Sequence, residues 1–180
     1  MRKAICILAV FAFMFSASTV GAQNAPKKPS GAAIFFANAD MKAKLQKMIA
    51  DKVQDDALRV VDVGDSNLGV FMIHLNPGQE PQAPVNMMSH NEVAEVYYVL
   101  SGEGFLYHGG TIENATPRDL TTTGGPSQGG PGKDTITQKV GPGDLFMITP
   151  NTPHQVNLGA KTEMVYLLVR VDLKKHLQLK

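Results

Sequence analysis

The chain has 180 residues, a length that suits one domain, and its 17 basic and 16 acidic side chains give a formal net charge of +1. Because the positive and negative charges nearly balance, nucleic acid or an anionic membrane surface is not expected as the main partner. The single cysteine, Cys6, excludes a disulfide framework, so the fold has to be stabilised by its core.

Residues 1–22 have the pattern of a secretory signal peptide. Arg2 and Lys3 precede an apolar run over residues 4–15, and small residues follow over residues 16–22. The apolar run is too short to span a bilayer comfortably, and this order of regions is typical of a cleaved signal. We expect cleavage after Ala22 and a periplasmic or secreted protein with no membrane association afterwards. Loss of Arg2 and Lys3 lowers the basic count from 17 to 15 and makes the formal charge −1.

Residues 23–57 are predicted to form a flexible lead-in and one N-terminal helix. Residues 23–30 are polar and contain proline, which suits a flexible segment after the cleavage site. Over residues 38–53, apolar side chains recur at helical spacing, and Asn38 or Asp40 can cap the first turn. We expect this amphipathic helix to pack its apolar stripe on the outside of the main domain; a partner-binding helix is the alternative.

Residues 58–173 are predicted to form an all-β barrel, followed by a basic tail over residues 174–180 in which His176 is expected to be solvated. Many short runs of β-branched and aromatic residues at close spacing are typical of an antiparallel sandwich or barrel. The runs are separated by Gly, Pro and Asn and cover residues 58–63, 68–75, 95–100, 104–108, 135–140, 144–148, 155–158 and 163–172.

Residues 121–134 interrupt this β region with the sequence TTTGGPSQGGPGKD. The high content of glycine and proline predicts a mobile loop in place of a strand. We interpret the loop either as a lid over a site or as a disordered surface insertion.

The first segment with chemical information joins a histidine to a buried carboxylate. His90 precedes Glu95 by five residues, and Glu95 opens a strand that ends in a Gly-Glu-Gly turn over residues 102–104. Side chains alternate along a strand, so Glu95 shares one face with Tyr97, while the opposite face is also apolar. A carboxylate in such a strand must be paired, hydrogen-bonded or bound to a metal, because an isolated buried charge costs several kcal/mol.

The second segment places another histidine at the start of a strand. A turn at Gly143 and Asp144 leads into an apolar strand, and a Pro-Asn-Thr-Pro turn over residues 150–153 reverses the chain before His154. The imidazole of His154 is therefore expected at a fixed position of the barrel.

These two segments resemble the motifs of the cupin superfamily, G-x5-H-x-H-x3/4-E-x6-G and G-x5-P-x-G-x2-H-x3-N. Five anchor positions agree, namely His90, Glu95, Gly102, Gly143 and His154, while Met88 stands in place of the first motif histidine. The resemblance covers roughly residues 68–171. It implies a double-stranded β-helix, a jelly-roll-like barrel, that binds a metal through His90, Glu95 and His154. It also implies a homodimer, formed through the helix over residues 38–53 or through the last strand.

With Met88 in the first histidine position, the ligand set is reduced to two imidazoles and one carboxylate. This set can form a facial triad with open positions, which suits Fe(II) in oxygen-activating enzymes and also accepts Mn, Co, Ni, Cu or Zn as one divalent ion. Met88 could supply a thioether that favours copper, although a methionine in a barrel is more often a space filler. Glu92 would replace Glu95 if the register slipped, but the strand pattern favours Glu95.

Two further residues are candidates for proton transfer. Tyr97 is interpreted as a cavity wall or as a proton donor to an oxyanion near the metal. His74 lies in the strand predicted over residues 68–75 and could reach the cavity from one of its faces; a hydrogen-bonded strand histidine is the alternative.

Two functions remain open. In the first, the chain is a metal-dependent enzyme that acts on a small organic molecule by oxygenase, isomerase or lyase chemistry, with Tyr97 or His74 moving protons. In the second, the barrel binds a small ligand or a metal without turnover, which the missing first histidine favours. A barrel that has lost its metal and keeps the three residues as a hydrogen-bonded cluster is a further alternative. The fold does not choose between these functions, because cupins host many chemistries.

Overall fold

The described part of the chain consists of one helix and twelve strands. The computed structural model describes residues 31, 33–76, 83–120, 122–157 and 163–180, so the predicted signal peptide and residues 23–30 of the lead-in lie outside it. The elements are α1 (Asn38–Asp51), β1 (Asp55–Asp62), β2 (Asn67–Leu75), β3 (Asn86–His90), β4 (Val93–Ser101), β5 (Gly104–His108), β6 (Thr111–Ile112), β7 (Thr116–Leu120), β8 (Gly125–Lys133), β9 (Ile136–Val140), β10 (Leu145–Ile148), β11 (His154–Asn157) and β12 (Met164–Asp172).

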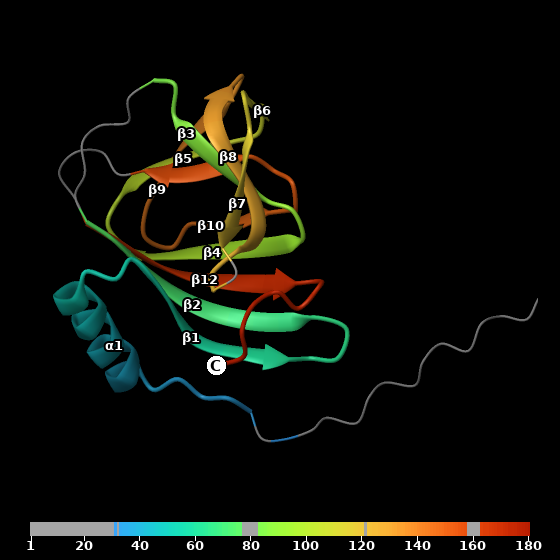
Figure 1. Cartoon of the computed structure of the whole chain (residues 1–180). Coiled ribbons are helices and arrows are strands. Elements are labelled where there is room, and N and C mark those ends of the chain that lie inside the picture. Colours follow the sequence, from blue (N-terminus) through green and yellow to red (C-terminus); the bar gives the residue numbers. More distant parts are fainter. Residues whose placement is uncertain (1–30, 32, 77–82, 121, 158–162) are drawn as a thin grey trace, which may run out of the picture. The chain divides into compact units, whose positions relative to one another are not determined.

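The strands form two sheets whose pairing order identifies the fold (Figure 1). One sheet has the order β1-β2-β12-β4-β10, and the other has the order β6-β8-β3-β11-β5-β9, with β7 paired to β8. Within these sheets, the sets β2-β12-β4-β10 and β3-β11-β5-β9 have the strand order of a jelly roll made of two Greek keys. The structure therefore confirms the all-β fold, and its strand order is that of the double-stranded β-helix that the resemblance implies.

The helix covers the outer face of the first sheet at β2 and β12. Met48 is buried against Met72 of β2 and Val165 of β12, and Met41 and Leu45 pack around this cluster. The predicted docking of the helix on the main domain is confirmed. Its packed stripe is narrower than predicted, because Ile49 and Val53 remain exposed. Among the residues that the structure describes, no helix combines the length and the apolar character that a membrane crossing requires.

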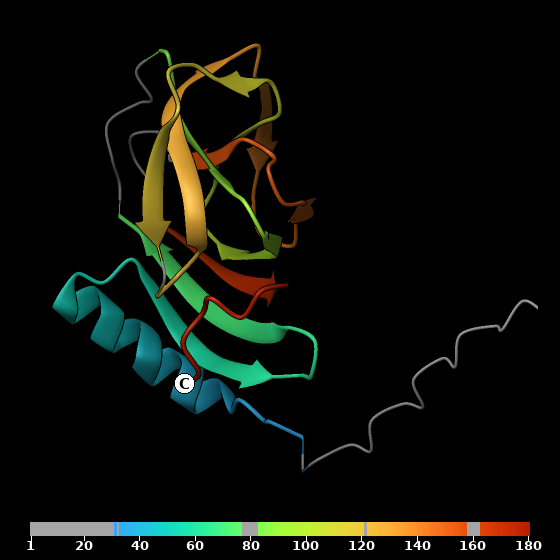
Figure 2. The ribbon, with the colours of Figure 1, turned by 45° about the vertical axis from the view of Figure 1, so that its right-hand side comes forward.

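Residues 125–133, predicted as part of a mobile loop, form the strand β8. β8 pairs with β3 on one side and with β7 on the other, and Figure 2 shows β7 and β8 side by side in yellow and orange. The loop prediction was wrong because these neighbours supply backbone partners that override the low strand propensity of glycine. Its glycines lie where other groups come close; a Cβ at Gly132, for example, would overlap Met87. The segment is part of the barrel wall and not a lid.

The segment after β12 folds back on the barrel. Leu177 is buried in the core; its N–H donates to Asp172 Oδ2 at 2.6 Å and its carbonyl accepts from Asn67 Nδ2 at 2.9 Å. His176, predicted to be solvated, instead lies with Nε2 2.6 Å from Glu92 Oε2. β12 is paired with β2 and with β4, so the last strand has no free edge through which it could extend the sheet into a second copy.

Candidate metal centre

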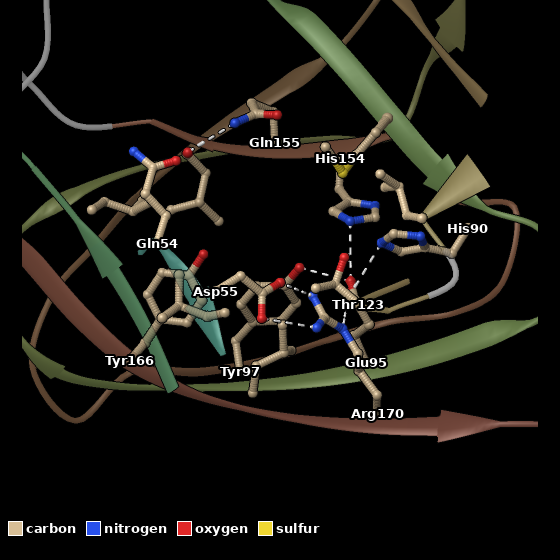
Figure 3. Close-up of a pocket in the computed structure, with 16 residues that line it drawn as sticks. Gln54, Asp55, His90, Glu95, Tyr97, Thr123, His154, Gln155, Tyr166 and Arg170 are labelled. Atoms are coloured by element: carbon tan, nitrogen blue, oxygen red, sulfur yellow. Dashed lines mark hydrogen bonds and ion pairs between the residues drawn. The ribbon is translucent and has the colours of Figure 1, made fainter. Parts of the chain in front are cut away.

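His90, Glu95 and His154 come together inside the barrel (Figure 3). His90 ends β3, Glu95 lies in β4 and His154 opens β11. His90 Nε2 lies 3.4 Å from Glu95 Oε1, and His154 Nε2 lies 3.1 Å from Glu95 Oε2. One donor atom from each residue lies within 4.8 Å of the others, and all three side chains are buried. The end of β3, the start of β11 and the strand β4 thus bring the three predicted ligands to one point.

Hydrogen bonds inside the protein fix the tautomers of both imidazoles. Ser127 Oγ donates its one proton to the Gly125 carbonyl at 2.8 Å, so it can only accept from His90 Nδ1, which lies 2.8 Å away. His154 Nδ1 donates to the Thr152 carbonyl at 2.9 Å, because a carbonyl oxygen has no proton to give. Each neutral imidazole therefore carries its proton on Nδ1 and directs an unprotonated Nε2 at Glu95. This is the arrangement of a metal-binding histidine.

The unprotonated nitrogens and the carboxylate together form a centre that fits a cation. Within the described residues, His154 Nε2 is buried and has no hydrogen-bond partner. Nitrogen lone pairs that face a carboxylate repel it unless a cation or added protons lie between them. Two donor atoms at about 2.1 Å from one ion lie about 3.0–3.4 Å apart at octahedral or tetrahedral angles. Each imidazole nitrogen lies this far from one oxygen of Glu95, His90 Nε2 at 3.4 Å from Oε1 and His154 Nε2 at 3.1 Å from Oε2, and one donor atom from each residue lies within 4.8 Å of the others. The group can therefore hold one ion.

Glu95 is an ionised carboxylate with a hydrogen-bond donor on each oxygen. Arg170 Nε donates to Oε1 at 2.9 Å, and the Tyr97 hydroxyl donates to Oε2 at 2.7 Å. Burial alone would raise the pKa of Glu95, but the charge of Arg170, whose Nε donates to Oε1, holds this pKa well below its usual value. Burial and the Glu95 charge raise the pKa of Tyr97 well above its usual value. Tyr97 therefore keeps its proton and acts as a donor.

Two charged residues of the centre were not predicted from the sequence. Arg170 of β12 is buried and bridges Glu95 and Asp55, the first residue of β1. A signal for Arg170 was present, because a charged side chain inside the apolar strand β12 needs a buried partner as much as Glu95 does. Asp55 gave no comparable signal, since it lies next to a second aspartate, Asp56, at the start of a strand.

The centre opens into a cavity of about 370 Å³, a size that suits a small organic molecule. Tyr97 lines the cavity, on the face that strand alternation predicts. Met88 also lines it and is the cross-strand partner of His154 between β3 and β11. The other lining residues are the polar Gln54, Asp55, Thr123, Gln155 and Arg170 and the apolar Ile73, Leu75, Leu120, Val156, Tyr166 and Leu168.

His74, the second candidate for proton transfer, lies outside this cavity. Its neighbours Ile73 and Leu75 line the cavity, so strand alternation places His74 on the opposite face of the sheet. There its Nε2 lies 3.1 Å from Glu163 Oε2. This contact agrees with the alternative prediction for His74, a hydrogen-bonded histidine in a strand. The predicted role of His74 in proton transfer is therefore corrected. Glu92 does not belong to the group of possible metal ligands; its carboxylate contacts His176.

In comparisons with known proteins, the chain is similar only to solved structures. No protein-family model and no curated protein matches the chain. A DMSP lyase from Ruegeria pomeroyi is 16% identical with a TM-score of 0.38; the match covers 64% of this chain and 45% of the lyase, so the chain spans less than half of its length. A cupin protein from Bacteroides fragilis is 20% identical with a TM-score of 0.37, covering 67% of this chain and 79% of that one. A cupin 2 conserved barrel domain protein from Salinispora arenicola is 14% identical with a TM-score of 0.38, covering 64% and 72%.

Proposed function

We propose that this chain is a secreted or periplasmic cupin-type protein that binds one divalent metal ion through His90, Glu95 and His154 and acts as an enzyme on a small organic molecule. The observation that carries the proposal is the pair of imidazoles whose Nδ1 atoms donate inside the protein while both Nε2 atoms face an ionised carboxylate. The secreted or periplasmic location rests on the signal-peptide pattern of residues 1–22.

In this proposal, the residues around the metal ligands have distinct roles. A bound ion would act as a Lewis acid on a substrate oxygen. Tyr97 donates its one hydroxyl proton to Glu95 Oε2 and so holds this carboxylate in place; because Tyr97 stays protonated, it cannot act as a base. The amide side chains of Gln54 and Gln155 and the hydroxyl of Thr123 line the cavity, where they can orient a substrate with hydroxyl or carbonyl groups. Oxygenase, isomerase and lyase reactions all fit this arrangement.

A second candidate function is a barrel that binds a ligand or a metal without turnover. It is favoured by the hydrogen bonds from Arg170 and Tyr97, which already occupy one position on each Glu95 oxygen and partly neutralise the carboxylate. A charge-paired cluster of this kind can persist as a structural feature of the core. Met88 in place of the first motif histidine is consistent with this candidate as well.

Metal binding is expected to raise the thermal stability of the protein. Zn²⁺ at a hundred times its dissociation constant should stabilise the metal-free protein by about 2.7 kcal/mol, which corresponds to a rise in Tm of roughly 5–10 °C for a chain of this size. The measurements are the metal content of untagged protein and thermal unfolding after chelation and after readdition of Zn²⁺.

Matched histidine variants make this test specific. His154→Gln should abolish the shift in Tm, whereas His74→Gln, the same change outside the cavity, should keep it. A protein that purifies without metal and shows no shift with Zn²⁺, Fe²⁺, Mn²⁺, Ni²⁺ or Cu²⁺ would rule out the proposal. Oxygen consumption or product formation by the metal-loaded protein with small organic substrates then separates an enzyme from a binding protein.

A further inference from the structure

Beyond the three ligand residues, the centre contains a row of alternating charges. Arg170 Nε donates to Glu95 Oε1 at 2.9 Å, and Arg170 Nη1 and Nη2 donate to the two oxygens of Asp55 at 3.2 and 2.9 Å. Figure 3 shows dashed contacts from the guanidinium to both carboxylates. Without Asp55, the charges of Glu95 and Arg170 would cancel; with Asp55, the row carries one negative charge that a cation can balance.

Arg170 is fixed in this position from several sides. Its Cζ lies 4.3 Å from the centroid of the Phe71 ring, as in a cation–π contact. The ring can lie there because Gly69, the β2 partner of Arg170, has no side chain, and a Cβ at Gly69 would overlap it. Because Arg170 is 5% exposed and paired at both ends, its charge stays beside Glu95.

The position of Arg170 creates a competition for one carboxylate oxygen. Glu95 Oε1 accepts from Arg170 Nε and is also the oxygen that lies 3.4 Å from His90 Nε2, on the side of the ligand atoms. A positive charge bonded to a ligand oxygen weakens that oxygen as a donor and repels an incoming cation, and both effects are strong in a buried site. Asp55 opposes both, because it neutralises the guanidinium and engages two of its nitrogens.

We propose that Asp55 sets the metal affinity of the centre by neutralising Arg170. This inference rests on the proposed function, since it concerns the same metal centre, and it adds a residue outside the ligand set that controls how tightly the ion is held. Asp55 acts through Arg170 and is therefore a positioning residue. The second carboxylate of β1, Asp56, is its matched control, because Asp56 pairs with Lys44 and Lys180 in place of Arg170.

The inference is tested by the affinity of the full chain for Zn²⁺, measured by competition with a chromophoric chelator, together with the visible spectrum of the Co²⁺ form. Asp55→Asn is expected to weaken Zn²⁺ binding by about 10–100-fold, the range found for residues that support metal ligands. Asp56→Asn should bind as the wild type does, and Asp55→Glu, which keeps the charge, should recover most of the affinity. The Co²⁺ spectrum should stay the same in all variants that bind, because the three ligands are unchanged.

A double variant separates charge neutralisation from a general effect on folding. Asp55→Asn combined with Arg170→Met removes both charges and should bind Zn²⁺ nearly as tightly as the wild type, even if Asp55→Asn alone does not fold. Equal affinities of Asp55→Asn and the wild type would overturn the inference while leaving the proposed metal centre intact. A double variant as weak as Asp55→Asn, or a folded double variant much weaker than the wild type, would overturn it too. A wild-type protein that binds no Zn²⁺ or Co²⁺ would instead refute the metal centre itself.

Discussion

Replacement of Glu95 by alanine is expected to abolish metal binding and, even in the metal-free protein, to lower the free energy of unfolding by about 3–5 kcal/mol. The reason is that Arg170 Nε and the Tyr97 hydroxyl both lose their acceptor in a buried place. A buried donor without a partner loses its hydration and gains nothing in return. Asp55 still pairs with the guanidinium, so the variant should fold, with reduced stability.

Urea unfolding of metal-free protein measures this loss, and two variants make it specific. Glu95→Gln keeps one acceptor oxygen, so it should lose less stability than Glu95→Ala while it also loses high-affinity metal binding. Glu92→Gln changes a more exposed carboxylate that pairs with His176 and should cost less than about 1 kcal/mol. If Glu95→Ala unfolded at the same urea concentration as the wild type, the hydrogen-bonded cluster around Glu95 would have no energetic role.

The ligand positions could be predicted because they depend on short-range information. The distance from His90 to Glu95, the turn before His154 and the alternation along β4 are all contained in segments of about fifteen residues. The same local argument correctly put Tyr97 on the face of Glu95, where it donates to the carboxylate. Motif spacing and strand alternation were therefore enough to find the three ligands and one cavity wall.

Partners that join distant strands were beyond such local arguments. Arg170 and Asp55 are 115 residues apart and meet because β1 and β12 both pair with β2. Strand alternation also predicts which residues share a face but not which face is inside. His74 illustrates this limit, because both faces of β2 are buried, one in the barrel and the other under the helix. α1 packs on the face of β2 that carries Met72, so His74, two residues further along the strand, lies on this outer face and not in the barrel.

The prediction of a mobile loop over residues 121–134 was wrong for a different reason. That reason is the role of the glycines in this segment. Glycine and proline lower strand propensity, and that rule predicted a loop. In the structure, however, the start of β8 borders the metal centre: Ser127 accepts from His90 Nδ1, and the backbone of Gly124, the turn residue just before β8, packs directly on the imidazole. The glycine is thus explained by close approach of the chain to a ligand residue, for which a side chain leaves no room.

This explanation predicts that Gly124→Ala weakens metal binding by about 10–100-fold while the protein stays folded. The new methyl group would overlap the His90 ring, which has to turn away; the turn breaks its hydrogen bond to Ser127 and moves Nε2 from the ligand position. Zn²⁺ affinity and circular dichroism measure the two parts of the prediction.

Gly129→Ala is the matched control, since it makes the same change a few residues further on, inside β8, but brings the methyl group against Arg118, a long side chain that can move aside. We expect Gly129→Ala to keep the wild-type affinity. Equal affinities of both variants would mean that Gly124 does not hold His90 in place, and the glycine at this position would then need another explanation. A selective loss in Gly124→Ala would show that the sequence feature most suggestive of a loose loop is a requirement of the metal centre, because the ligand imidazole occupies the space that a side chain would fill.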